Sequence, residues 1–106
     1  MENVAKKEMA EALYQRGIAS FSKGKYQETI EALTNCISME KTEQYEYLEA
    51  DAYNTLGMLF FFAGYETIAL DYYLSALESA RRQYNTGGVV SAFLNIGLLY
   101  QAGKEY

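Results

Sequence analysis

The sequence predicts one all-α domain of about five helices, and three observations support that fold class. Half of the 106 residues are hydrophobic and 15% are aromatic, which suits a single core that needs no disulfide or metal. The chain contains no proline, so its helical segments are not interrupted by that residue. Glycines recur at intervals of forty residues, at Gly17, Gly57 and Gly97, which indicates a repeated helical unit.

The first two helices are predicted over residues 3–23 and 26–39. Apolar residues follow the helical period in both segments, and Leu33 and Ile37 lie on one stripe of the second. Gly24 is expected to end the first helix, because glycine readily adopts the left-handed conformation that terminates a helix. The two segments therefore predict a helical hairpin.

A third helix is predicted over residues 43–63 and a fourth over 66–84. Thr42 is the expected N-cap of the third helix, since its hydroxyl can accept a hydrogen bond from an amide of the first turn. Gly64 is expected to end this helix and to begin the turn into the fourth. These two segments predict a second hairpin.

A fifth helix is predicted over residues 89–102. The segment 85–88 before it combines asparagine, threonine and two glycines, and is expected to form a turn with a cap. Gly103 is expected to close the helix.

Setting the three recurring glycines in register aligns further positions forty residues apart. Gly24 aligns with Gly64, and Leu33 aligns with Tyr73. Small residues at a helix crossing let two backbones approach closely, while large residues fill the space around the contact. We therefore expect the successive hairpins to pack in the same way.

These residues resemble the tetratricopeptide repeat, whose thirty-four-residue unit combines aromatic, Leu-Gly, Gly-x-Tyr and Ala positions. The matching residues are Tyr53, Leu56, Gly57, Phe60, Gly64, Ala69, Tyr73 and Ala76, with a looser copy in Leu13, Gly17, Gly24, Tyr26, Leu33 and Cys36. The resemblance extends over residues 10–106. It implies antiparallel helix pairs stacked as a right-handed superhelix, with the first helix of each pair lining a concave groove.

The resemblance also implies a domain organisation. One domain is expected over residues 1–106, with repeats at 10–41, at 50–81 with a helix extension from 43, and at 88–106 as a partial third copy. The repeat unit is forty residues long, and Lys41 and Arg81 replace the proline that usually ends the second helix. The chain ends where the second helix of the third repeat is expected, so we expect that repeat to be truncated.

The charge of the chain disfavours several classes of partner. The formal net charge is −5, and the nine basic residues form no stripe that would bind nucleic acid or an anionic membrane. The amino terminus lacks a signal pattern, and the uncharged run at residues 52–65 is too short to span a bilayer. A single cysteine cannot form an intrachain disulfide, so a cytoplasmic protein is expected.

The residue types that support catalysis are largely missing. The chain has no histidine and one cysteine, so we expect no enzyme activity, no cofactor and no metal site. Cys36 aligns with small packing residues and is expected to be a buried thiol rather than a reactive one. An acidic run precedes and enters the third predicted helix; its members are Glu40, Glu43, Glu46, Glu49 and Asp51. Such a run either forms a solvated face or attracts a basic partner.

The resemblance implies a peptide-binding groove. The residues carried over to it are Tyr14, Ile18, Phe21, Asp51, Asn54, Met58, Phe61, Phe62, Leu94, Asn95, Leu98 and Gln101. The amides are suited to hydrogen-bond the backbone of a peptide, and the apolar side chains to form pockets for its residues. Any single one of them could equally serve helix packing. Family members that hold a partner's terminal carboxylate use lysine and arginine, which residues 43–63 and 89–102 lack, so that subtype is disfavoured.

We therefore predict a non-enzymatic scaffold for protein–protein interaction that binds a peptide or helix in its concave groove. One alternative is the N-terminal regulatory or sensory segment of a larger bacterial signalling protein, with an output domain such as a diguanylate cyclase or a transcription regulator. Another is a structural fragment that assembles into a homo-oligomer. Self-association is expected through the fifth helix, whose uncapped apolar residues are Val90, Phe93, Ile96 and Leu99.

Overall fold

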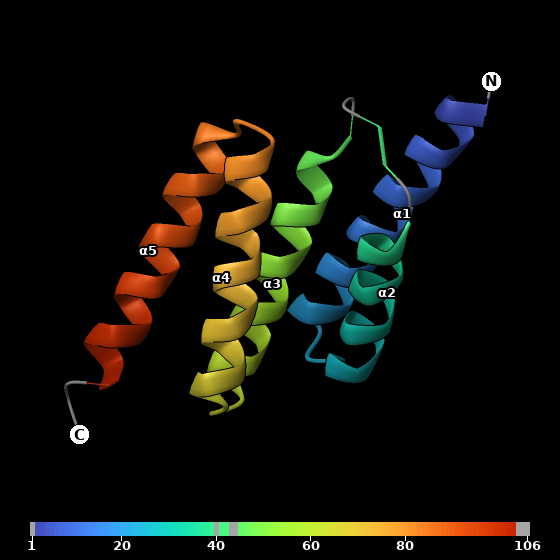
Figure 1. Cartoon of the computed structure of the whole chain (residues 1–106). Coiled ribbons are helices and arrows are strands. Elements are labelled where there is room, and N and C mark those ends of the chain that lie inside the picture. Colours follow the sequence, from blue (N-terminus) through green and yellow to red (C-terminus); the bar gives the residue numbers. More distant parts are fainter. Residues whose placement is uncertain (1, 40, 43–44, 104–106) are drawn as a thin grey trace.

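The structure is a computed structural model that describes residues 2–39, 41–42 and 45–103. Within these residues the chain forms five helices and no strand: α1 (Glu2–Ser22), α2 (Tyr26–Ser38), α3 (Tyr47–Phe62), α4 (Glu66–Arg82) and α5 (Thr86–Gly103). Figure 1 shows the helices stacked in chain order from α1 to α5. The all-α fold class is confirmed.

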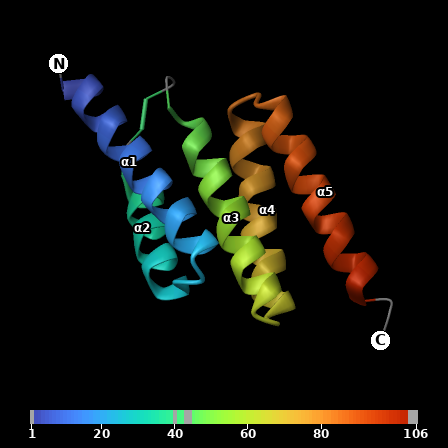
Figure 2. The same cartoon turned by 180° about the vertical axis from the view of Figure 1, so that it is seen from behind.

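The five helices form two layers. Helices α1, α3 and α5 make one layer, because α3 contacts both α1 and α5, while α2 and α4 make the other. Each helix also packs against the next one along the chain. In the view from behind, α1 and α3 lie in front of α2 and α4 (Figure 2). The Cα atoms extend over 52 × 31 × 16 Å, so the two layers form a flat, elongated stack.

The hydrophobic core runs through the stack from one helix junction to the next. At one end Cys36 of α2 packs with Ala10 and Leu48, from α1 and α3. At the other end Tyr73 of α4 packs with Leu99 of α5. Burying each large apolar side chain contributes about 1.5–3 kcal/mol. Each helix is therefore held in place mainly by its immediate neighbours.

Helices α1 and α3 end in the turns that their glycines predict. Gly24 has φ +75° and Gly64 has φ +91°, both in the left-handed region. The amide after each glycine donates to the carbonyl five residues earlier, at 2.9 Å after Gly24 and 2.8 Å after Gly64. This pairing satisfies carbonyls that the last helical turn leaves free, so both predicted helix ends are confirmed.

Helix α3 begins later than predicted. The expected start near residue 43 with Thr42 as N-cap is wrong, because α3 begins at Tyr47, follows Glu46 and has no side-chain cap. Instead the amide of Tyr45 donates to the Thr42 carbonyl at 3.1 Å, which turns the chain before the helix begins. The Tyr45 side chain is fully buried among the core residues of α1, α2 and α3, so core packing sets the start of α3.

Helix α5 begins earlier than the predicted residue 89. The Asn85 Oδ1 accepts a hydrogen bond from the Gly88 amide at 3.0 Å, which makes Asn85 the N-cap. Thr86 is then the first helical residue. The segment 85–88 therefore contains the predicted cap, but three of its residues form the first turn of α5.

Candidate binding groove

A cavity of about 290 Å³ lies on the α1–α3–α5 layer. Its lining combines one residue of α1, four of α3 and three of α5: Tyr14, Asp51, Asn54, Thr55, Met58, Ser91, Leu94 and Asn95. Six of these are predicted groove residues, namely Tyr14, Asp51, Asn54, Met58, Leu94 and Asn95. Residues from the first helix of each pair therefore meet around one cavity.

Helix α3 supplies most of this lining because of the spacing of its residues. Asp51, Asn54 and Met58 are separated by three and four positions, which places them on one face of an α-helix. The opposite face carries Leu56, which is buried in the core. The α-helical period thus fixes which α3 side chains reach the cavity.

Asn54 and Asn95 join α3 and α5 across the cavity. The Asn95 Nδ2 donates to the Asn54 Oδ1 at 3.2 Å, and Asn54 is only 7% exposed. Such a hydrogen bond contributes about 1 kcal/mol. The Asn54 amide nitrogen and the Asn95 carbonyl oxygen have no partner within residues 2–39, 41–42 and 45–103. One donor and one acceptor therefore remain for a ligand.

Asp51 and Tyr14 bring titratable groups to the same cavity. Burial raises the pKa of the Asp51 carboxyl above its ordinary value. Burial also raises the pKa of the Tyr14 phenol, and the negative charge of Asp51 raises it further, while a hydrogen bond with Thr55 acts in the opposite direction. The cavity therefore has a partly desolvated, negatively charged wall.

The other predicted groove residues lie outside this lining; they are Ile18, Phe21, Phe61, Phe62, Leu98 and Gln101. Phe21 of α1 stacks on Phe62 of α3, with 6.0 Å between the ring centroids. Phe62 also contacts Phe61 and remains 63% exposed. Leu98 and Gln101 are exposed on α5, whereas Ile18 is half-buried on α1. The phenylalanines thus form an apolar surface one turn beyond Met58 along α3.

Two residues of the lining, Thr55 and Ser91, were not predicted. The Thr55 Oγ1 donates to the Asp51 carbonyl at 3.0 Å, which holds its hydroxyl on the α3 backbone. Each lies four positions from a predicted groove residue, Thr55 after Asp51 and Ser91 before Asn95. Extending the helical period by one turn would have identified both.

The acidic run does not form one face. Glu49 Oε1 lies 2.6 Å from Arg82 Nη2, an ion pair that links α3 to α4. Asp51 instead lies in the cavity. Glu46 precedes α3 and is half-buried, while Glu40 and Glu43 lie outside the described residues.

The predicted packing role of Cys36 is confirmed. Its side chain is fully buried, and its Sγ donates to the Ala10 carbonyl at 3.5 Å. Burial raises the pKa of the thiol, and the nearby Lys41 ammonium partly opposes this effect. Full burial and the raised pKa disfavour the reactive thiolate.

The predicted self-association residues of α5 divide between core and surface. Ile96 and Leu99 pack against α4 and belong to the core. Val90 and Phe93 are about half exposed, and the Arg81 guanidinium lies 5.8 Å from the Phe93 ring centroid. The exposed apolar residues of α5 are Val90, Phe93, Leu94, Leu98 and Tyr100.

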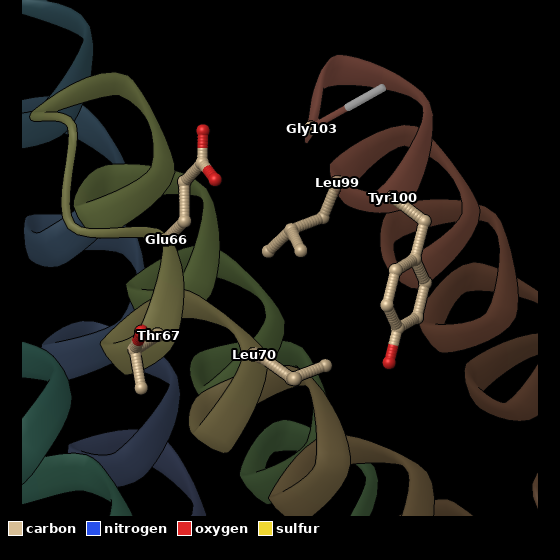
Figure 3. Close-up of a pocket in the computed structure, with 6 residues that line it drawn as sticks. All are labelled: Glu66, Thr67, Leu70, Leu99, Tyr100 and Gly103. Atoms are coloured by element: carbon tan, nitrogen blue, oxygen red, sulfur yellow. The ribbon is translucent and has the colours of Figure 1, made fainter. Parts of the chain in front are cut away.

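A second cavity, of about 620 Å³, lies between the start of α4 and the end of α5. Figure 3 shows Leu70 of α4 and Leu99 of α5 pointing into it. One repeat earlier, Phe60 occupies the position of Tyr100 and is covered by Tyr72 of α4, with 5.5 Å between the stacked ring centroids. The described residues contain no corresponding cover for the α4–α5 cavity.

Within the described residues, no group of three or more His, Cys, Asp or Glu is placed to hold a metal ion. None of the helices in this part of the chain is long and apolar enough to cross a membrane. The predicted cytoplasmic location stays a prediction.

Comparison with known families identifies the repeat. The sequence model of the tetratricopeptide repeat matches residues 10–43, and no catalytic family is indicated. Comparisons with curated proteins and with solved structures gave no match. Repeats of this kind are typical of protein–protein interaction modules. Residues 10–43 thus match the tetratricopeptide repeat, and the packing of the five helices is consistent with repeats of that kind.

Proposed function

We propose that the chain is a non-enzymatic interaction module that binds a peptide or helix in the groove of α1, α3 and α5. The observation that carries this proposal is the 290 Å³ cavity in which residues of these three helices converge. Its lining supplies apolar side chains, one free amide donor and one free carbonyl acceptor. These are the groups that anchor side chains and orient a peptide backbone.

Peptide selection from a random display library tests the proposal. We expect the intact chain to enrich peptides that bind in solution, and Asn54→Ala with Met58→Ala to weaken their binding at least about ten-fold. The matched control is Asn35→Ala with Met9→Ala, because both residues are exposed and neither lines the cavity. Circular dichroism checks that both double variants remain folded. Equal binding by the two double variants would place the site elsewhere.

A second candidate function is self-association through α5. It is favoured by the half-exposed Val90 and Phe93 and by the apolar cavity between α4 and α5. We expect the mass from light scattering to rise with protein concentration, and Phe93→Glu to suppress that rise. A monomer at high concentration would contradict this function and leave the groove proposal intact.

A further inference from the structure

Asp51 is the one charged residue that lines the groove cavity, and no basic residue in the described part of the chain forms an ion pair with it. Its carboxylate has no hydrogen bond or ion pair with the part of the chain that the structure describes. Glu49, two residues earlier on the same helix, has Arg82 as its partner at 2.6 Å. The two carboxylates leave α3 in different directions, one toward α4 and the other into the groove.

No residue that lines the cavity offers a cation to Asp51. Neither α3 nor α5 contains a lysine or arginine. The residue that α1 contributes to the lining is Tyr14, whose phenol is uncharged at neutral pH. A half-buried carboxylate without a positive partner is costly, and a cation supplied by a ligand would remove much of that cost.

The surroundings of Asp51 suit a long basic side chain. The aromatic ring of Tyr14 and the thioether of Met58 line the same cavity and can contact the aliphatic stem of lysine or arginine. A volume of about 290 Å³ is at the lower end of ligand pockets, so it fits one peptide side chain better than a drug-sized molecule. The free groups of Asn54 and Asn95 lie beside it for the peptide backbone.

We propose that the groove selects a peptide segment that places one lysine or arginine side chain against Asp51, with apolar residues on one side of it. This inference rests on the proposed groove function and adds the chemistry of the partner. Met58 lies roughly 10 Å and Phe62 roughly 16 Å along α3 from Asp51. In an extended peptide these distances correspond to apolar residues about three and five positions from the basic one.

The test compares peptides selected from a random library of about twelve residues, which span roughly 40 Å when extended. The baits are the unmodified chain, Asp51→Asn and Asp71→Asn. Asp71 is an exposed carboxylate on α4, so this control makes the same change in net charge away from the groove. We expect the unmodified chain and Asp71→Asn to select a fixed lysine or arginine, and Asp51→Asn to lose that preference while keeping the apolar positions.

A change in the selected peptide tests the same contact on the unmodified chain, so this test does not depend on the stability of Asp51→Asn. Replacing the selected lysine by norleucine should weaken binding to the unmodified chain about ten-fold, and binding to Asp51→Asn less than about two-fold. Selected peptides without a fixed basic position, or a preference that survives Asp51→Asn, would overturn this inference and leave groove binding intact. Absence of any selected peptide would overturn both.

Discussion

Gly57 of α3 lies directly against the ring of Tyr73 of α4, so closely that a Cβ atom at residue 57 would lie 2.5 Å from Tyr73 Cδ1. One repeat earlier, a Cβ atom at Gly17 would lie 2.5 Å from Leu33 Cδ2. The same contact thus recurs in both helix hairpins, with a glycine on the first helix and a large residue on the second. Close helix approach at these glycines is confirmed.

Gly57→Ala should destabilise the fold. The added methyl group would displace the buried Tyr73 ring, and such overpacking costs about 1–3 kcal/mol, more than the gain of up to about 1 kcal/mol in helix propensity. Urea unfolding measures the change. Gly97→Ala is the matched control, because nothing lies within 4 Å of a Cβ atom at that position. It should stabilise the fold by about 0.5–1 kcal/mol, and a loss of stability there would contradict this account.

Tyr84→Gly should also stabilise the fold. Tyr84 follows α4 in the left-handed conformation, with φ 53°, whereas the left-handed residues that follow α1 and α3 are glycines. The Tyr84 side chain is 94% exposed. The left-handed conformation costs a residue with a side chain about 1–2 kcal/mol, and glycine avoids this cost. Glycine loses more conformational entropy on folding, but this loss offsets only part of the gain. We expect a net gain of about 0.5–1 kcal/mol in thermal or urea unfolding. Gly64→Ala is the reciprocal change and should lose about 1 kcal/mol.

Cys36 should report on unfolding through its reactivity. Its thiol is fully buried and its pKa is raised by burial, so the native protein should react with a thiol reagent only through opened molecules. We expect labelling to be slower than for the urea-unfolded chain by at least about 10³-fold, and to rise in parallel with the loss of helical signal. Fast labelling of the folded chain would show that the α1–α2 contact opens locally.

The sequence predicted those features that depend on local periodicity. The ends of α1 and α3 follow from Gly24 and Gly64, because a glycine in the left-handed conformation acts within a single turn. The resemblance to the tetratricopeptide repeat implied the groove residues of α3, and the spacing from Asp51 to Met58 places them on one helical face.

The features that the sequence did not predict depend on tertiary contacts. The start of α3 depends on burial of Tyr45 between three helices, which overrides the local N-cap pattern at Thr42. Helix α5 is apolar on several faces, so periodicity could not separate buried Leu99 from exposed Leu98.

The ligand-facing hydrogen bond is likewise a tertiary feature. Asn54 and Asn95 are 41 residues apart in the chain, and only the packing of α3 on α5 brings their side chains together. The resemblance to the tetratricopeptide repeat implied which helices would line the groove, but not that these two amides would bond to each other.

Asp51 should make the free energy of unfolding depend on pH. Burial raises the pKa of Asp51 above 3.8, so the folded state favours the protonated carboxyl. Its contribution to stability is therefore complete below the unfolded-state pKa and is lost as the pH rises through the higher folded-state value. Near neutral pH the charged carboxylate opposes folding, and the neutral amide of Asp51→Asn should remove that penalty.

We therefore expect Asp51→Asn to melt at a higher temperature than the unmodified chain near neutral pH, and the difference to shrink below pH 3.8. Asp71→Asn corrects for the change in net charge, because Asp71 is exposed on α4. A lower melting temperature for Asp51→Asn at neutral pH would mean that the carboxylate stabilises the free protein. A higher one, together with weaker binding of basic peptides, would show that Asp51 lowers the stability of the fold while contributing to recognition.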